Sequence, residues 1–268
     1  MKLHISRFDV ATIKAHRVIL VVGKRGTGKS VLLQDWMYHM REQVHLPIGM
    51  SPTEASLEMM RGFMPNALVH RGGINTGLLA DLIKHQRQSL ADADASTEHV
   101  LICCDDTSYD KSALRTTEVR ELFMNGRHLK TCFILSSQYL MDLDPSLRTQ
   151  IDYVVALRDS TKENIKKLYQ MFFGAFDTLA DFETTFRALT HNYGAIVLDQ
   201  TVASTSLTDQ IFWYKANPQM PELRTFKLGR ARYHQMSNLY RPKKGESDEA
   251  AAQETGTKQA ITHIEKGE

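Results

Sequence analysis

The sequence predicts an α/β fold of three layers, in which a mostly parallel sheet lies between helices on both faces. Short apolar runs alternate with longer segments of helical spacing along most of the chain, as in strand–helix–strand units. Several apolar runs end directly in acidic or polar residues, and the carboxyl ends of parallel strands are where ligands gather. A glycine-rich turn joins the first apolar run to the first helical segment.

The composition is that of an ordinary globular protein. Of the 268 residues, 42% are apolar and 24% are charged, and the net charge of +2 indicates no particular class of partner. The N-terminus is too polar for a signal peptide, and no apolar run approaches the roughly 20 residues of a membrane span. The three cysteines, Cys103, Cys104 and Cys132, lie in or beside apolar runs without metal-ligand spacing, which indicates buried thiols in a reducing compartment. We therefore expect a soluble intracellular protein.

The first half of the chain shows the alternation most clearly. Val18–Val22 is an apolar run ended by glycine, which predicts a buried strand, and a segment with apolar residues on one helical face follows it. Pro52 lies in a predicted first helical turn, where proline is tolerated. Gly72 and Gly73 end the third predicted strand before a further helix. The predicted order is strand 18–22, helix 29–41, strand 46–50, a helix start at 51–54, strand 67–70, helix 76–88, loop 89–98 and strand 100–104.

The second half continues the pattern up to about residue 240. The predicted elements are helix 111–125, strands 132–135 and 153–157, helices 161–173 and 178–190, and strands 195–198 and 211–214. We expect residues 1–240 to form a single domain. From Arg241 to Glu268 the composition shifts to small and charged residues with almost no large apolar groups, which predicts a disordered tail, 241–268.

The turn after the first strand fits the pattern G-x-x-x-x-G-K-[ST], which predicts a phosphate-binding loop. Glycines let backbone N–H groups turn toward phosphate oxygens, and the following helix adds its positive end. Lys29 can reach the β- and γ-phosphates, and the Ser30 hydroxyl can ligate Mg²⁺. The alternative is a glycine-rich turn with an exposed lysine. We expect ATP and Mg²⁺ as cofactors, with the nucleotide held by Gly23, Lys24, Arg25, Gly26, Thr27, Gly28, Lys29 and Ser30.

Two carboxylates follow the strand 100–104. Asp105 is expected close to Ser30, where it would hold Mg²⁺ directly or through water. Asp106 points differently because side chains alternate along a strand, and it could orient or deprotonate the attacking water. A register slip of one residue would exchange these roles, and a simple strand cap is the alternative. The pair favours hydrolysis over phosphoryl transfer to an acceptor.

The strand around residues 132–135 ends in Ser136, Ser137 and Gln138. If it lies beside the other two strands, Gln138 can contact the γ-phosphate or the water, and the alternative is a polar strand terminus. An arginine from a neighbouring subunit often stabilises the transition-state charge. Arg127 is the first choice for that role and Arg148 the second, with a surface salt bridge as the alternative for either.

Taken together, GKRGTGKS, LICCDD and NGRHLKTCFILSSQYLMDLDPSLRTQIDYVVALRD resemble the genome-packaging ATPases of nucleocytoplasmic large DNA viruses, the poxvirus type within the FtsK–HerA superfamily. The resemblance runs from about residue 16 to 200 and is most specific in 125–159. It implies a three-layer P-loop NTPase fold of the RecA/ASCE kind. It also implies a ring-forming motor that uses ATP to drive double-stranded DNA into a preformed capsid.

The resemblance also implies roles for single residues. Lys29 and Ser30 match the nucleotide and Mg²⁺ groups, and Asp105 matches the metal carboxylate. Asp106 matches the catalytic acid, although many members of the superfamily have glutamate there. Gln138 matches the sensor, which detects whether the nucleotide is intact. Arg127 matches the arginine that acts on the nucleotide of a neighbouring subunit.

The partners implied are double-stranded DNA, further copies of the chain in a ring of five or six subunits, and a capsid or membrane protein at the packaging vertex. The place implied is the host cell cytoplasm, in the virus factory, and the virion. Basic clusters that could contact DNA phosphates, or could simply be solvated faces, are Lys162, Lys166 and Lys167; Lys84, His85 and Arg87; and Arg224, Lys227, Arg230 and Arg232.

Two other functions fit the phosphate loop. A phosphotransferase would act on a small acceptor and would need an arginine-rich lid, which the sequence does not display. A nucleotide-controlled binding module would assemble on a capsid or membrane partner with little turnover.

Overall fold

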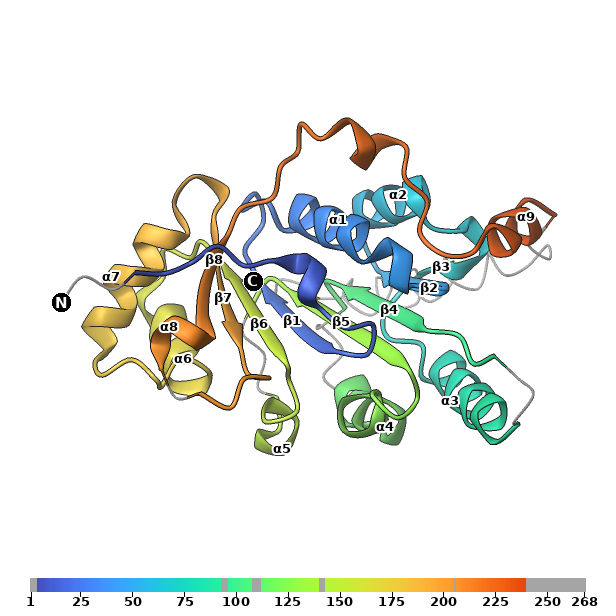
Figure 1. Cartoon of the computed structure of the whole chain (residues 1–268), viewed down its shortest axis with the longest axis horizontal. Helices are drawn as coiled ribbons and strands as arrows, with labels where there is room; N and C mark the ends of the chain where they lie inside the picture. The colour runs from blue at the N-terminus through green and yellow to red at the C-terminus, as the bar shows by residue number, and fades with distance from the viewer. Residues whose placement is uncertain (1–3, 93–95, 108–111, 140–142, 205, 240–268) are drawn as a thin grey trace, which may run out of the picture.

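One eight-stranded sheet runs through the protein, with helices on both faces (Figure 1). The structure is a computed structural model that describes residues 4–92, 96–107, 112–139, 143–204 and 206–239. The strand order is β3-β2-β4-β5-β1-β6-β7-β8. The strands are β1 (Val18–Val22), β2 (Leu46–Ser51), β3 (Val69–Arg71), β4 (Val100–Asp105), β5 (Thr131–Ser137), β6 (Tyr153–Leu157), β7 (Ala195–Asp199) and β8 (Ile211–Tyr214).

Six neighbouring strands, from β3 to β6, are parallel, whereas β7 is antiparallel to β6 and β8 is antiparallel to β7. The predicted fold class, a mostly parallel α/β sheet, is therefore confirmed. Residues 6–8, near the N-terminus, run along the outer side of β8. The Phe8 N–H donates to the Trp213 carbonyl at 2.8 Å, and the Trp213 N–H donates to the Ser6 carbonyl at 3.0 Å.

The helices form two layers. In Figure 1, α1 and α2 lie on one face of the sheet, and α3, α4 and α5 lie on the other. The α-helices are α1 (Lys29–Met40), α2 (Glu54–Phe63), α3 (Thr76–Ala91), α4 (Thr117–Asn125), α5 (Pro145–Arg148), α6 (Lys162–Met171), α7 (Leu179–Leu189), α8 (Leu207–Gln210) and α9 (Ala231–Leu239). Short 3₁₀ turns cover Val10–Thr12, Arg41–Gln43, Asn66–Leu68, Ala113–Arg115, His191–Tyr193 and Pro221–Arg224.

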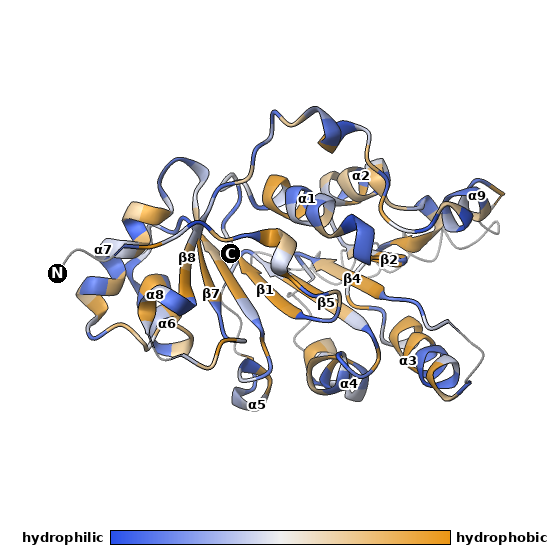
Figure 2. Ribbon diagram, in the orientation of Figure 1, coloured by the Kyte–Doolittle hydropathy of each residue, from blue (hydrophilic) through white to orange (hydrophobic). Residues whose placement is uncertain are grey.

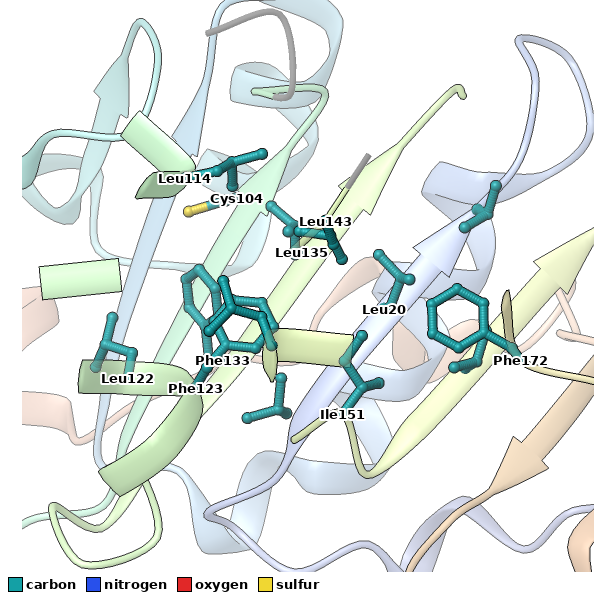
Figure 3. Close-up of a cluster of buried hydrophobic side chains, with 14 of the residues drawn as sticks. Leu20, Cys104, Leu114, Leu122, Phe123, Phe133, Leu135, Leu143, Ile151 and Phe172 are labelled. Atoms are coloured by element: carbon teal, nitrogen blue, oxygen red, sulfur yellow. The ribbon is translucent and has the colours of Figure 1, made fainter. Parts of the chain in front are cut away.

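The central strands are apolar on both sides, as strands covered by two helix layers must be (Figure 2). Leu20 and Phe133 belong to the cluster under α3 and α4, which Figure 3 shows, whereas Ile19 and Ile134 belong to the cluster under α1 and α2. The three cysteines are fully buried, as expected, and burial raises the pKa of each thiol.

Most predicted elements lie within one or two residues of their observed bounds, although α3 continues three residues beyond the predicted helix 76–88. The predicted strand 67–70 is split into a 3₁₀ turn after Pro65 and the short β3. The predicted helix 111–125 is reduced to α4, because Thr116 has an extended backbone and separates α4 from a 3₁₀ turn. The short α8 and the last helix, α9, were not predicted. The predicted tail, 241–268, lies outside the described residues. No helix among the described residues is long and apolar enough to cross a membrane.

Candidate nucleotide-binding site

Three strand ends meet at one edge of the sheet, because β5 lies between β1 and β4. The Gly23 N–H, just after β1, donates to the Ser137 carbonyl at 3.0 Å. The Asp106 N–H, just after β4, donates to the Ser136 carbonyl at 3.0 Å. The phosphate-loop motif, the acidic pair and Gln138 are therefore adjacent, as the sequence led us to expect.

The phosphate loop has the shape of a cradle. Gly28 has a φ of 95°, in the left-handed region that favours glycine, and caps α1 without a side-chain hydrogen bond, so that the first N–H groups of the helix have no side-chain acceptor there. A Cβ atom at Gly23 would lie 2.9 Å from both Leu157 Cδ1 and Thr27 Oγ1. The loop thus combines tight backbone packing with a free helix start, and both features suit a bound phosphate group.

The Lys24 side chain extends from the loop to two residues of another segment. Its ammonium group lies 2.8 Å from Asp159 Oδ1 and donates to Thr161 Oγ1 at 2.6 Å. Burial alone would raise the pKa of Asp159, but the hydrogen bonds from Lys24, the Thr161 N–H and Asn164 outweigh it and lower that pKa. Lys24 therefore ties the loop to the connection between β6 and α6, and the neighbouring Arg25 is exposed.

The buried Lys29 side chain points at the acidic pair. Its Nζ atom is hydrogen-bonded to Asp106 Oδ1 and lies 3.6 Å from Asp105 Oδ1. Only 7% of the Lys29 side chain is exposed. A charged lysine that is this deeply buried needs a compensating anion, and here the two carboxylates supply it.

Two hydroxyl groups hold Asp105. Ser56 Oγ, at the start of α2, donates to Asp105 Oδ2 at 2.6 Å, and Ser136 Oγ, in β5, donates to Asp105 Oδ1. Asp105 is itself fully buried. Sequence reasoning did not single out Ser56, since it lies in a helix start that matches no motif and its contact depends on the β2–β4 pairing.

Asp106 adopts a strained backbone conformation. Its φ is 55°, which a residue with a side chain rarely adopts. In this conformation Asp106 Oδ2 accepts a hydrogen bond from Gln138 Nε2 at 2.8 Å, while Oδ1 faces Lys29. Strain of this kind is common at functional sites. Asp106 therefore joins the end of β5 to the phosphate loop.

The donor set fits a nucleotide with Mg²⁺. Lys29 is the cation nearest the two aspartates, and Ser30 is exposed in the first turn of α1. Mg²⁺ prefers oxygen ligands and usually binds through one or two protein groups together with phosphates. Ser30 and Asp105 would supply those groups. Among the described residues there is no cluster of three or more His, Cys, Asp or Glu side chains that could hold a metal alone.

The predicted arginines lie elsewhere. Arg127 is exposed in the turn that precedes β5, and Arg148 ends α5, before β6. Both are at the amino ends of parallel strands, whereas the site is at the carboxyl ends. Along the seven residues of β5 the separation is about 20 Å. The structure therefore does not bring Arg127 to the site of its own chain, and only a neighbouring copy could use it.

The basic clusters differ in their surroundings. Arg230 and Arg232 form ion pairs with Glu98, at 3.2 and 2.7 Å. Arg87 pairs with Glu121 at 2.7 Å, which leaves fewer free charges on α3. By contrast, the three lysines of the remaining cluster are exposed on α6, which follows the Asp159 connection beside the phosphate loop; they are Lys162, Lys166 and Lys167.

Comparison with known proteins decides the family. The family model described as "Poxvirus A32 protein" matches residues 5–210, which is most of the chain. The chain belongs to the poxvirus A32 protein family. The resemblance drawn from the phosphate loop, the acidic pair and 125–159 is thereby confirmed.

Relatives of this A32-family chain occur in large DNA viruses. The uncharacterized protein L437 of Acanthamoeba polyphaga mimivirus is 29% identical over 249 residues, which cover 89% of this chain and 84% of the relative. The uncharacterized protein 088R of Invertebrate iridescent virus 3 is 29% identical over 215 residues, which cover 80% of this chain and 81% of the relative.

Solved structures share the fold of this A32-family protein. The genome packaging NTPase B204 of Sulfolobus turreted icosahedral virus 2, in complex with AMPPCP, matches with a TM-score of 0.56 and 16% identity, over 77% of this chain and all of that protein. ATPases 2 and 3 of EssC from Geobacillus thermodenitrificans match with a TM-score of 0.53 and 12% identity, over 84% of this chain and 44% of that one. The P-loop ATPase fold is therefore shared well beyond the family.

Proposed function

We propose that this protein is an ATP-hydrolysing motor that moves double-stranded DNA into a viral capsid. The observation that carries the proposal is the contact chain from Lys29 through Asp106 to Gln138, which joins the ends of β1, β4 and β5. Membership of the A32 family and the fold shared with a viral genome packaging NTPase support it. That NTPase was also solved with ATP-gammaS, which supports an adenine nucleotide as ligand.

Each residue of the site would have its own role in ATP hydrolysis. Lys29 would exchange its carboxylate partners for the phosphates of the nucleotide, which releases Asp106 from its ion pair. Asp106 would then orient a water molecule and accept its proton, with Gln138 as a second hydrogen-bonding group beside it. Mg²⁺, held by Ser30 and Asp105, would neutralise phosphate charge. Ser56 and Ser136 keep Asp105 in place during this exchange.

The partners belong to the same proposal. A homo-oligomeric ring of five or six subunits would place Arg127, which lies at the opposite edge of the sheet, against a neighbour's nucleotide. The exposed lysines of α6 would meet DNA phosphates, which gives binding that tolerates any sequence and weakens with salt. A capsid or membrane protein would hold the ring at the packaging vertex, in the cytoplasm of the infected cell.

The decisive experiment measures phosphate release by the full chain with ATP and Mg²⁺, with and without duplex DNA. We expect duplex DNA to stimulate turnover and Lys29→Ala to reduce it by at least about a hundredfold, because the γ-phosphate loses its main cation. Lys14→Ala changes an exposed lysine outside the site and serves as the matched control.

Other outcomes would favour other functions. Phosphate transfer that depends on a small acceptor would indicate a phosphotransferase. Tight nucleotide binding with negligible turnover, whether or not DNA is present, would indicate a nucleotide-controlled binding module.

A further inference from the structure

A cavity of about 780 Å³ opens directly beside the phosphate loop. Gly28 of the loop and Val31 of α1 form one side of it, so the cavity and the phosphate cradle share a wall. The rest of its lining comes from Arg7, Tyr193, Trp213 and residues 215–219. Its volume lies in the range of sites that bind small organic ligands, about 300–1,000 Å³.

Tyr193 forms the part of the wall nearest to the loop. A Cβ atom at Gly28 would lie only 3.2 Å from Tyr193 Cδ1, so the aromatic ring lies against the loop backbone. Yet the residue is 63% exposed, which is unusual for a large ring with apolar faces. One face of the ring is therefore available to a ligand in the cavity.

The turn that carries Tyr193 is strained. Asn192 and Tyr193 have φ values of 51° and 62°, so two successive residues with side chains are in the left-handed region. The backbone is also crowded at Gly194, where a Cβ atom would lie 2.1 Å from the Leu189 carbonyl oxygen. The turn thus carries two successive side chains at positive φ beside the loop, and such backbone conformations cluster at functional sites and ligand contacts.

A second exposed aromatic ring also lines the cavity. Trp213 of β8 is 36% exposed, and the Arg7 guanidinium lies 5.9 Å from the centre of its ring. Three polar residues also line the cavity, namely Lys215, Asn217 and Gln219. Apolar ring faces combined with a few polar groups suit a flat heterocycle that carries donors and acceptors on its edge.

We propose that this cavity binds the base of the nucleotide whose phosphates occupy the loop, with Tyr193 as the stacking residue and Trp213 as the second wall. The proposal rests on nucleotide binding at the loop, as proposed above. It adds that affinity depends on the base and not on the triphosphate alone. Base–aromatic stacking tolerates different bases because every base has a π-face, so purine nucleoside triphosphates of either kind would fit.

Calorimetry on the full chain with Mg²⁺ would compare two probes, ATP and inorganic tripolyphosphate. We expect the wild type to bind ATP at least about tenfold more tightly than tripolyphosphate, and Tyr193→Ala to weaken ATP binding by about fivefold or more while tripolyphosphate binding is unchanged. Tyr193→Phe keeps the ring and should keep the preference. Thermal unfolding of each variant verifies that it is folded.

The fluorescence of Trp213 gives an independent readout. The chain has two tryptophans, and Trp36 is only 1% exposed. We expect ATP, and not tripolyphosphate, to change the emission, and Trp213→Phe to abolish the change.

The results separate this proposal from the one on which it rests. If Lys29→Ala abolishes binding of both probes but Tyr193→Ala leaves their ratio unchanged, the phosphate site stands and the base site is wrong. Equal affinity of the wild type for ATP and tripolyphosphate would also overturn the base site alone. If the wild type binds neither probe, both proposals fail.

Discussion

Lys29 of the phosphate loop forms an ion pair with Asp106, which follows the strand two positions away in the sheet. The cation that should bind phosphate is therefore occupied by the group that should activate water. Each charge compensates the other in a largely buried position. A nucleotide that draws Lys29 toward its phosphates would release the carboxylate for chemistry, so binding and activation would be coupled in one exchange of partners.

Asp106→Asn should separate binding from turnover. Asparagine keeps the size of the side chain and can still accept the Gln138 hydrogen bond, but it cannot take a proton from water. We expect phosphate release to fall by a factor of about a hundred or more, while nucleotide affinity stays equal or increases because Lys29 loses a competitor. Single-turnover kinetics and calorimetry would measure the two quantities. Turnover within threefold of the wild type would contradict the assignment of Asp106.

Ser56→Ala should affect Mg²⁺ use. The substitution removes the 2.6 Å hydrogen bond to Asp105 Oδ2 and leaves part of a buried carboxylate unpaired, at a cost of about 1–3 kcal/mol. We expect a lower melting temperature and a higher Mg²⁺ concentration for half-maximal activity, both partly recovered in Ser56→Thr. Ser206→Ala alters an exposed serine before α8 and is the control. An unchanged Mg²⁺ requirement would mean that Ser56 only stabilises the fold.

Mixed assemblies should reveal whether Arg127 acts across subunits. Arg127→Ala and Asp106→Asn chains are each expected to be inactive alone. Because Arg127 lies at the far edge of the sheet from its own site, some interfaces of a mixed ring would combine an intact Arg127 with an intact Asp106. We expect activity to recover on mixing and to peak near equal amounts. Failure to recover at every ratio, with recovery when Arg148→Ala replaces Arg127→Ala, would transfer the role to Arg148.

Stability should fall when the pH drops below about 6.5. Burial, followed by the effect of nearby charges, lowers the pKa of His16, His45 and His99 from the ordinary value of 6.5. In this range the unfolded chain takes up protons that the folded chain does not, so acidification favours unfolding. The full stability is present above 6.5 and is lost as the pH falls toward the lowered pKa values.

Thermal unfolding between pH 8 and pH 5 would test this expectation. His99→Gln should flatten the decline, whereas His128→Gln, at an exposed histidine, should leave it unchanged. A melting temperature equal at pH 7 and pH 5 would contradict the prediction. A second decline is expected at more acidic pH, because the pKa of Asp159 is also lowered in the folded state.

The sequence predicted those features that depend on local pattern. The glycine spacing of the loop and the apolar runs before Gly23 and Asp105 specify strands and a turn without reference to the rest of the chain. Gln138 could be placed because β5 is another uninterrupted apolar run, and parallel strands share an edge. The positive φ of Asp106, however, occurs at a residue whose backbone N–H pairs with Ser136, in a distant segment, and local pattern does not indicate it.

Other features could not be predicted for the same reason. Ser56 contacts Asp105 across 49 positions of sequence, and the Tyr193 ring lies against Gly28 from a turn much later in the chain. Neither serine nor tyrosine carries a pattern that signals such a contact. The position of Arg127 at the far edge follows directly from strand direction, so the sequence could have indicated that its own site is out of reach.

The two edge strands of the sheet, β3 and β8, bear on how copies can associate. Residues 6–8 are already hydrogen-bonded to Trp213 of β8, and β3 is only three residues long. Short or covered edge strands discourage the pairing of sheets from separate molecules. In the proposed ring, neighbouring copies would then meet through side chains, and such contacts would open and re-form without disturbing the sheet inside either molecule.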